Sequence, residues 1–201
     1  MGKLFCLIGK SASGKDTIYR RLLGDESLGL KPVVTYTTRP KRSGEREGVE
    51  YHFTDKAQLE AFKSEGKVLE ERIYHTVYGD WYYFTADDGQ VVLDKHSYVI
   101  ITTPEALAGI TAYYGRKNVV PVYITLDDGE RLERALKRER SQENPGYSEM
   151  CRRFLADEKD FSEENLIRAG VSEESYFINN ELSVCLSQIG EMIRGYGLSE
   201  D

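Results

Sequence analysis

Short apolar runs alternate with amphipathic stretches at the start of the chain. Residues 3–8 are apolar and bounded by glycine, which is typical of a buried strand. After a glycine-rich turn, Ile18, Leu22 and Leu23 recur at helical spacing, and Gly24 ends the stretch. A strand, a glycine turn and a helix in this order predict the opening unit of an α/β domain.

The middle of the chain has a different pattern. Short β-rich runs at residues 33–38, 51–54 and 67–85 surround one amphipathic stretch at residues 55–64. That stretch begins with Asp55 and has Gln58 three positions later, which is a helix-capping signal. Several neighbouring strands with tight turns predict a small mixed or antiparallel sheet inserted into the parent fold.

The α/β alternation resumes in the last part of the chain. Apolar β-rich runs at residues 98–102 and 119–126 suit central parallel strands. The pattern also predicts one more short strand and several helices, at residues 104–113, 129–141 and 148–169, with the strand at 175–178 and a final helix after it.

Composition narrows the class of protein. With 201 residues, a hydrophobic fraction of 40% and a charged fraction of 30%, the chain is typical of one globular domain. No run approaches the roughly 20 apolar residues of a membrane helix, and the N-terminus lacks a leader pattern. We therefore expect a cytoplasmic protein with no membrane partner.

Charge is unevenly distributed. The formal net charge of -7 argues against binding to a nucleic-acid polymer. Basic residues nevertheless gather at residues 39–46 and 131–153, and such clusters suit small, highly charged anions. Taken alone, the second cluster is equally consistent with solvated helix faces.

The glycine-rich turn fits the first seven positions of the phosphate-binding pattern G-x-x-x-x-G-K-[ST]. Glycines let successive N–H groups point inward, the helix adds its positive end, and the lysine reaches the terminal phosphates. The context of strand, turn and helix is the one this motif requires. The predicted ATP phosphate-binding residues are Gly9, Ser11, Ala12, Ser13, Gly14, Lys15, Asp16 and Thr17.

Asp16 departs from the pattern, which has serine or threonine at the eighth position. The hydroxyl at that position normally binds Mg²⁺. Asp16 either replaces it as a charged metal ligand or complements the helix N-terminus. We take Asp16 as the candidate metal ligand.

A second anion site is predicted between residues 35 and 53. Arg39 and Arg42 can grip a phosphate bidentately, and the Tyr51 hydroxyl can add a third contact. Here the chain resembles the guanylate kinase family, whose pattern is T-T-R-x-x-R-x-G-E-x-x-G-x-x-Y-x-F. The resemblance runs along nearly the whole length.

The resemblance implies a fold and a division of the chain. The fold is the three-layer α/β fold of P-loop NTPases with a central parallel sheet. The core would comprise residues 1–34, 86–136 and 154–201, with a monophosphate-binding insertion of small mixed sheet at residues 35–85. A helical lid would cover about residues 137–153.

The resemblance also implies activity and partners. The substrates would be ATP, with Mg²⁺, and a nucleoside monophosphate, with GMP converted to GDP. The protein would be a monomer or a homodimer. Because the acceptor is a phosphate that is already ionised near neutral pH, the reaction would need no general base, only positioning and charge neutralisation.

Individual roles follow by matching positions. Arg39, Arg42, Tyr51 and Tyr78 would hold the phosphate of the monophosphate. Thr35 and Glu70 would contact guanine, whose N1–H and amino group offer two adjacent donors to a carboxylate. Catalytic roles fall to Lys15 and to arginines of the lid, which are Arg138, Arg140 and Arg153, with Arg134 and Arg152 as further candidates.

Two positions leave alternatives open. Asn179 matches a family asparagine near the adenine of ATP, although a plain strand-end turn explains it nearly as well. Residues 100–104 lack the aspartates that the family has at the end of a central strand. We therefore hypothesise that Asp16 replaces the missing carboxylate functionally.

This departure supports one competing interpretation, a related kinase for another nucleotide or phosphorylated small molecule. A non-catalytic guanylate-kinase-like interaction module is the other. It is less consistent with the intact residues Gly9, Gly14 and Lys15.

Overall fold

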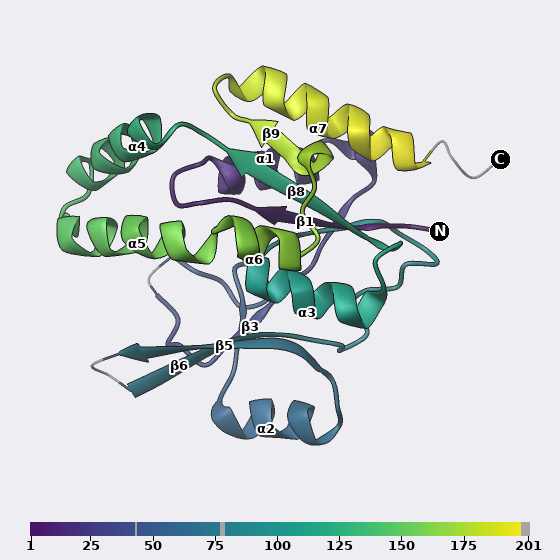
Figure 1. The fold of residues 1–201 in the computed structure, drawn as a ribbon. Coiled ribbons are helices and arrows are strands. Elements are labelled where there is room, and N and C mark those ends of the chain that lie inside the picture. The colour runs from purple at the N-terminus through teal and green to yellow at the C-terminus, as the bar shows by residue number, and fades with distance from the viewer. Residues whose placement is uncertain (43, 77–78, 198–201) are drawn as a thin grey trace.

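The computed structural model describes residues 1–42, 44–76 and 79–197. Within these ranges the centre of the fold is a five-stranded parallel sheet of order β2-β7-β1-β8-β9. Figure 1 labels three of its strands, β1, β8 and β9. The middle strand of this sheet has all five residues buried, as expected when both faces of a parallel sheet are covered. The strands are β1 (Leu4–Ile8), β2 (Lys31–Pro32), β7 (Tyr98–Ile101), β8 (Val119–Thr125) and β9 (Tyr176–Ile178).

Helices cover both faces of this sheet. Leu4, Cys6 and Ile8 of β1 belong to a core cluster that includes residues of α3 (Pro104–Tyr114) and α6 (Glu163–Arg168). The alternate residues of β1 belong to a second cluster, with residues of α1 (Lys15–Gly24) and α7 (Leu182–Gly197). The side chains of one strand therefore feed two separate cores, and the predicted three-layer α/β fold is confirmed.

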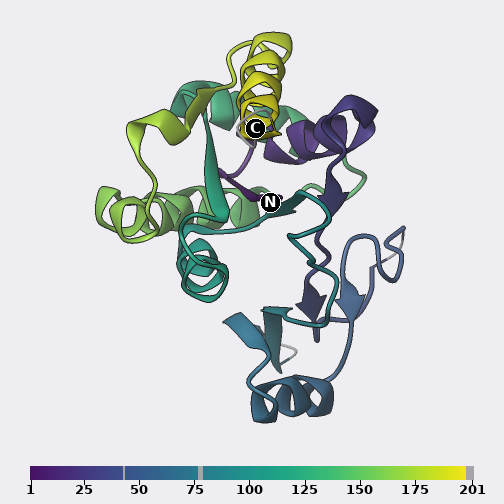
Figure 2. The same cartoon turned by 90° about the vertical axis from the view of Figure 1, so that its right-hand side faces the viewer.

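The inserted region forms a smaller mixed sheet of order β4-β3-β6-β5. Figure 2 shows this sheet and α2 below the central sheet. Asp55 caps α2 by accepting a hydrogen bond from the Gln58 N–H at 2.8 Å, as its spacing predicts. The elements are β3 (Tyr36–Thr37), β4 (His52–Phe53), α2 (Lys56–Ser64), β5 (Val68–Thr76) and β6 (Gly79–Ala86).

The strand predicted at residues 33–38 was wrong in extent, because the chain passes here from one sheet to the other. β2 ends at Pro32 on the central sheet, and β3 begins at Tyr36 on the smaller one. Between them the Gln90 side chain bonds the N–H and the carbonyl of Val34, at 2.7 and 3.1 Å. A side chain thus satisfies backbone groups that a strand partner would otherwise take.

The helix predicted over residues 148–169 was also wrong, because it is two helices. After α4 (Asp128–Arg140), α5 (Tyr147–Asp160) ends before Phe161, which is buried and stacks on Tyr123 with ring centroids 5.6 Å apart. Ser162 then caps α6 by accepting from the Asn165 N–H.

Short 3₁₀ turns lie at Glu26–Leu28 and Glu173–Ser175. No helix in the described ranges has the length and apolar character to cross a membrane.

Candidate active site

The phosphate loop joins β1 to α1 at the carboxyl end of the central sheet. Ala12 and Gly14 adopt left-handed backbone conformations, with φ of 62° and 94°. Gly9 meets a different constraint, because a Cβ there would lie 2.7 Å from the Ile124 carbonyl oxygen. No side chain caps α1 at Gly14. Anions therefore have access to N–H groups at a positive helix end.

Asn179, which follows β9, supports this loop through a hydrogen bond to its backbone. The Asn179 side-chain amide donates to the Ser13 carbonyl at 2.7 Å, and the Asn179 backbone N–H donates to the Thr125 carbonyl at 2.9 Å. Position 14 suits glycine because its φ of 94° is left-handed, and a Cβ there would also lie 2.2 Å from the Asn179 amide nitrogen. Asn179 is 3% exposed, so its clearest role is to brace the loop. The predicted adenine contact stays a prediction.

Lys15 opens α1 and is 17% exposed, with its Nζ 3.7 Å from the carboxylate of Asp16. Burial lowers the pKa of Lys15; the charges of Arg153 and Arg138 act in the same direction, and Asp16 and Asp157 oppose it. The two arginines predicted for the lid therefore lie within electrostatic reach of the loop lysine. Asp16 is 75% exposed, and Thr17 follows it in the same turn.

The arginines of the predicted lid divide into two groups. Arg138 of α4 and Arg153 of α5 line a cavity of about 330 Å³, together with Ser11 of the phosphate loop and Arg42 of the inserted region. Arg140 is exposed and is not part of this lining. The cavity thus brings together residues of the glycine-rich loop, of α4 and α5, and of the inserted region.

The nearby Arg134 and Arg152 differ from the lining arginines. Arg134 donates to the Asn179 carbonyl at 3.1 Å, beside the loop. Arg152 is 60% exposed and pairs with Glu149 at 2.7 Å. Arg134 is therefore a second support of the loop, whereas Arg152 is a surface residue in this conformation.

A buried ion pair that sequence reasoning missed ties the loop to α4 and α5. Asp157 accepts from the Ser11 N–H at 2.7 Å, and Arg131 donates to the Ser11 carbonyl at 3.1 Å. The two side chains meet at 3.0 Å, with Arg131 1% exposed and Asp157 13% exposed. Lys10 of the loop adds a contact to Glu158 at 2.5 Å. The charge cluster at residues 131–153 was a signal for Arg131, but no local pattern indicates its partner.

Arg39 is held in place by the inserted region. It forms a bidentate pair with Glu45 at 2.8 and 2.9 Å, and its Nε donates to the Tyr83 hydroxyl at 3.0 Å. The Arg39 guanidinium also lies 5.4 Å from the Tyr51 ring centroid. Hydrogen bonds from Arg39 lower the pKa of Glu45 to about 2. Glu45 and Tyr83 are thus partners of Arg39 to which the sequence assigned no role, although Glu45 belongs to the recognised motif.

The other residues predicted for the phosphate of the monophosphate surround this arginine. Arg42 is exposed, with its N–H donating to Glu45 at 2.7 Å. The Tyr51 ring packs edge-on against Tyr83 at 5.6 Å, and burial raises its pKa. Tyr78, also predicted here, lies outside the described residues.

The residues predicted for the base lie on the inserted region. The Thr35 carbonyl accepts from the His52 N–H at 2.8 Å. Glu70 is 5% exposed; one carboxylate oxygen accepts from the Thr85 hydroxyl at 2.6 Å, and the other from Arg72 Nε at 3.2 Å. The guanine contact of Glu70 remains a prediction, and Thr85 and Arg72 were missed.

The end of β7 offers no carboxylate, in agreement with the departure seen in the sequence. Thr102 is buried, and its N–H donates to the Leu7 carbonyl at 2.9 Å. Thr103 caps α3 by accepting from the Ala106 N–H. At this strand end, which lacks an acid, Thr103 is therefore a helix cap and Thr102 is held through its backbone N–H.

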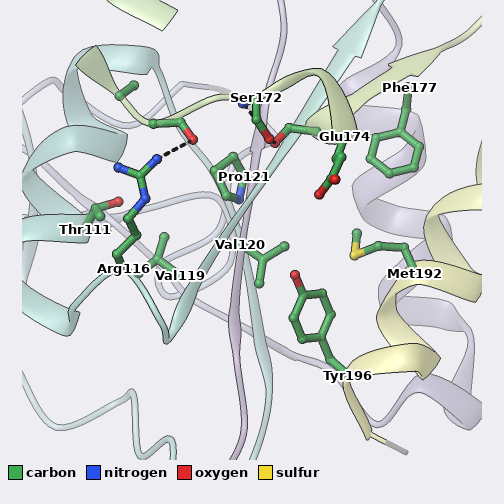
Figure 3. Close-up of a pocket in the computed structure, with 13 residues that line it drawn as sticks. Thr111, Arg116, Val119, Val120, Pro121, Ser172, Glu174, Phe177, Met192 and Tyr196 are labelled. Atoms are coloured by element: carbon green, nitrogen blue, oxygen red, sulfur yellow. Dashed lines mark hydrogen bonds between the residues drawn. The ribbon is translucent and has the colours of Figure 1, made fainter. Parts of the chain in front are cut away.

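A second cavity, of about 270 Å³, lies at the start of β8 (Figure 3). Arg116 and Glu174 line it, and Arg116 donates to the Gly170 carbonyl at 3.4 Å. None of the predicted site residues lines this cavity. The candidate site is therefore the cavity at the carboxyl end of the sheet, where ligands of open α/β sheets bind.

Comparisons with known proteins all match this chain to guanylate kinases. The family model described as guanylate kinase matches residues 1–165. A guanylate kinase of Symbiobacterium thermophilum is 32% identical over 200 residues, covering 96% of this chain and 84% of that protein. A guanylate kinase of Neisseria gonorrhoeae is 38% identical over 100 residues, which are 50% of this chain and 46% of that protein. The chain thus spans about half the length of that curated relative.

Among solved structures, a guanylate kinase of Anaplasma phagocytophilum superposes with a TM-score of 0.62 at 20% identity. The superposition covers 99% of this chain and 88% of the other. At this level of identity the likeness concerns the fold.

Proposed function

We propose that this chain, which belongs to the guanylate kinase family, transfers the terminal phosphoryl group of ATP to a nucleoside monophosphate, with GMP as the acceptor. The observation that carries the proposal is the cavity of about 330 Å³ lined by Ser11, Arg42, Arg138 and Arg153. A donor on the phosphate loop and an acceptor on Arg42 would meet across it, with the lid arginines beside the transferred group.

The loop supplies the donor half of this arrangement. The N–H groups that remain open at the start of α1 suit the ATP phosphates, and Lys15 would reach the terminal ones. The N–H groups of Ser11 and Ser13 donate instead to Asp157 and to the Lys10 carbonyl. Asn179 and Asp157 hold the backbone of Ser13 and Ser11 in position from two sides. The site is thus pre-organised, which is how positioning lowers a phosphoryl-transfer barrier.

The inserted region would supply the acceptor half, with unequal roles for its two arginines. Arg39 commits four of its five N–H donors to Glu45, Tyr83 and the Pro40 carbonyl. Arg42 is exposed and lines the cavity. Arg42 would therefore be the main contact of the acceptor phosphate, and Arg39 would orient the surrounding side chains and add its remaining N–H.

The residues at the loop fit Mg²⁺ bound together with a nucleotide. Within the described residues no group of three or more acidic, histidine or cysteine side chains could hold a metal ion without other ligands. Mg²⁺ normally takes one or two carboxylates, phosphate oxygens and waters. Asp16, exposed beside Lys15, offers one such carboxylate, and the ion would supply charge neutralisation to the ATP phosphates.

The chemistry then requires no proton removal by the protein. An ionised oxygen of the acceptor phosphate forms a bond to the terminal phosphorus of ATP, the bond to the bridging oxygen breaks, and ADP leaves with that oxygen's electron pair. Lys15, Arg138 and Arg153 would stabilise the developing charge. Exclusion of water would follow from closure of the helices and the inserted sheet over both substrates.

The test is a panel of monophosphates offered with ATP and Mg²⁺ to the full chain. ADP formation is measured for GMP, dGMP, IMP, AMP, CMP and UMP, and we expect GMP to give the highest kcat/KM. ADP formation no faster than with ATP alone, for every monophosphate, would refute the proposal. Lys15→Ala serves as the inactive control, because it removes the phosphate-binding cation.

A second candidate rests on residues 102–104, where no carboxylate ends β7. It is a kinase of the same kind acting on a different nucleotide or on a phosphorylated small molecule. A highest kcat/KM for CMP or UMP, or for a sugar phosphate added to the same panel, would favour it. The oligomeric state and the cytoplasmic location stay predictions.

A further inference from the structure

Arg72 lies beside the carboxylate proposed to recognise the base, although no sequence motif singles it out. Its Nε donates to Glu70 at 3.2 Å, and its side chain is 19% exposed, against 5% for Glu70. Both residues come from β5, two positions apart. Side chains at that spacing project from the same face of a sheet. Arg72 and Glu70 therefore form one surface.

The partner strand places this surface next to the phosphate-binding pair. Arg72 is opposite Tyr83 of β6, whose hydroxyl accepts from Arg39. The charge of Arg72 also reaches Tyr51: burial raises the pKa of Tyr51, and Arg39 and Arg72 oppose that rise. Arg72 thus lies between the carboxylate of Glu70 and the residues predicted to hold the acceptor phosphate.

The guanidinium of Arg72 has donors left for a ligand. Within the described residues, the hydrogen bond to Glu70 uses Nε, and the two Nη groups carry four further N–H donors. Glu70 accepts on one oxygen from Arg72 and on the other from Thr85. Each carboxylate oxygen has a further lone pair, so Glu70 can still accept from a ligand.

A carboxylate with a neighbouring guanidinium has a definite complement. It suits a ring edge in which an N–H donor lies next to a carbonyl acceptor, as in the N1–H and 6-oxo groups of guanine and hypoxanthine. Adenine has the reverse order, because its N1 accepts and its 6-amino group donates. It would place an amine against Arg72 and a lone pair against Glu70. Unpaired groups of this kind are how a polar site rejects the wrong ligand.

We propose that Arg72 is a specificity-determining residue of the acceptor site, donating from its Nη groups to the 6-oxo group of the base while Glu70 accepts from N1–H. The proposal rests on the proposed function. It names the acceptor class as 6-oxopurine monophosphates, because the end of β7 adds no second carboxylate for the 2-amino group. GMP and IMP therefore share the contact, and AMP does not.

The test compares Arg72→Met and Arg72→Lys with the wild-type chain, using GMP, IMP and AMP as acceptors. For Arg72→Met we expect KM for GMP and for IMP to rise by about 10- to 100-fold, the range for a lost charged hydrogen bond. We expect kcat, the KM for ATP and kcat/KM for AMP to change little. Arg72→Lys should recover part of the loss, because it keeps a charged donor. Arg168→Met is the matched control, since Arg168 is 66% exposed and pairs with Glu164 on α6.

Calorimetric titration of GMP and denaturant unfolding of each variant separate lost binding from lost folding. Equal losses for GMP, IMP and AMP would overturn the proposal, because Arg72 would then act on the phosphate or on the fold. A loss for GMP without one for IMP would also overturn it. If the wild type uses GMP and Arg72→Met keeps the same GMP-to-AMP preference, only the role of Arg72 fails. If the wild type uses no monophosphate, the proposed function fails and the role of Arg72 fails with it.

Discussion

Replacing Arg131 by methionine would remove the buried cation that ties the phosphate loop to α4 and α5. The Arg131 side chain is 1% exposed and contacts Asp157 at 3.0 Å and the Ser11 carbonyl at 3.1 Å. Methionine keeps much of the apolar stem, including packing near the Phe154 ring, which lies 4.7 Å from the guanidinium. The change therefore tests the charge more than the volume.

The loss of stability in Arg131→Met depends on which partners of Arg131 stay buried without their cation. Breaking a buried ion pair by removing one partner costs about 3–5 kcal/mol. Asp128 and Glu158, which also contact Arg131, are 51% and 46% exposed and can regain water. Asp157 is 13% exposed and keeps the Ser11 N–H, so we expect the lower end, about 3 kcal/mol. For a chain of this size that is a fall in Tm of about 6–12 °C.

The assay is urea unfolding followed by circular dichroism, with the KM for ATP measured in parallel. The matched control is Arg152→Met, because Arg152 is 60% exposed in its pair with Glu149 and should lose at most about 1 kcal/mol. We expect the KM for ATP to rise in Arg131→Met, since the Ser11 backbone loses a support. Arg131→Met with Asp157→Leu should recover part of the stability, because no unpaired buried charge remains.

Three outcomes would refute this reasoning. The first is a loss in Arg131→Met no larger than that of the control. The second is a double variant less stable than Arg131→Met alone. The third is an unchanged KM for ATP in a destabilised Arg131→Met, which would separate the ion pair from the function of the loop.

The remaining predictions concern the loop and the second anion site. Lys15→Ala should lower kcat by about 10³-fold or more, because the terminal phosphates lose their cation; ADP formation within tenfold of the wild type would contradict it. Asp16→Ala should raise the Mg²⁺ concentration needed for half-maximal activity, and an unchanged Mg²⁺ titration would sink the metal-ligand role. Glu45→Gln should lose about 1–2 kcal/mol of stability at neutral pH, because the hydrogen bonds of Arg39 lower the pKa of Glu45 from 4.5 to about 2 and solvent screens part of this interaction. That contribution is present above pH 4.5 and is lost as the pH falls towards 2, so the difference between wild type and Glu45→Gln in urea unfolding should shrink over this window.

Much of the fold could be predicted because its signals are local. The opening unit is one example, since an apolar run, a glycine turn and a helical repeat lie within 24 residues. The cap of α2 is another, because Asp55 and Gln58 are three positions apart. The division between α5 and α6 was missed although Ser162, which caps α6, is a local signal. The burial of Phe161 against Tyr123 is a contact between distant parts of the chain, which the local pattern does not show.

The candidate site likewise has residues that the sequence indicated and contacts that it did not. The motif at residues 35–53 indicated Arg39, Arg42 and Tyr51, and the structure places them in one region. The sequence did not indicate that Arg39 is largely committed to Glu45 and Tyr83. Nor did it indicate that Arg72 contacts Glu70, because residue spacing on a strand shows a shared face and not a hydrogen bond.

By itself the sequence determined the α/β class, the phosphate loop and the family of this protein, because these depend on residues close together along the chain. Only the tertiary structure decided what supports the loop. Asp157 reaches Ser11 across 146 positions, and Asn179 reaches Ser13 across 166. Asn179 meets the loop because parallel strands bring their carboxyl ends to one edge of the sheet, whereas Asp157 reaches it from α5, a helix packed against α4. The identity of the residues that meet there depends on packing, which no local pattern contains.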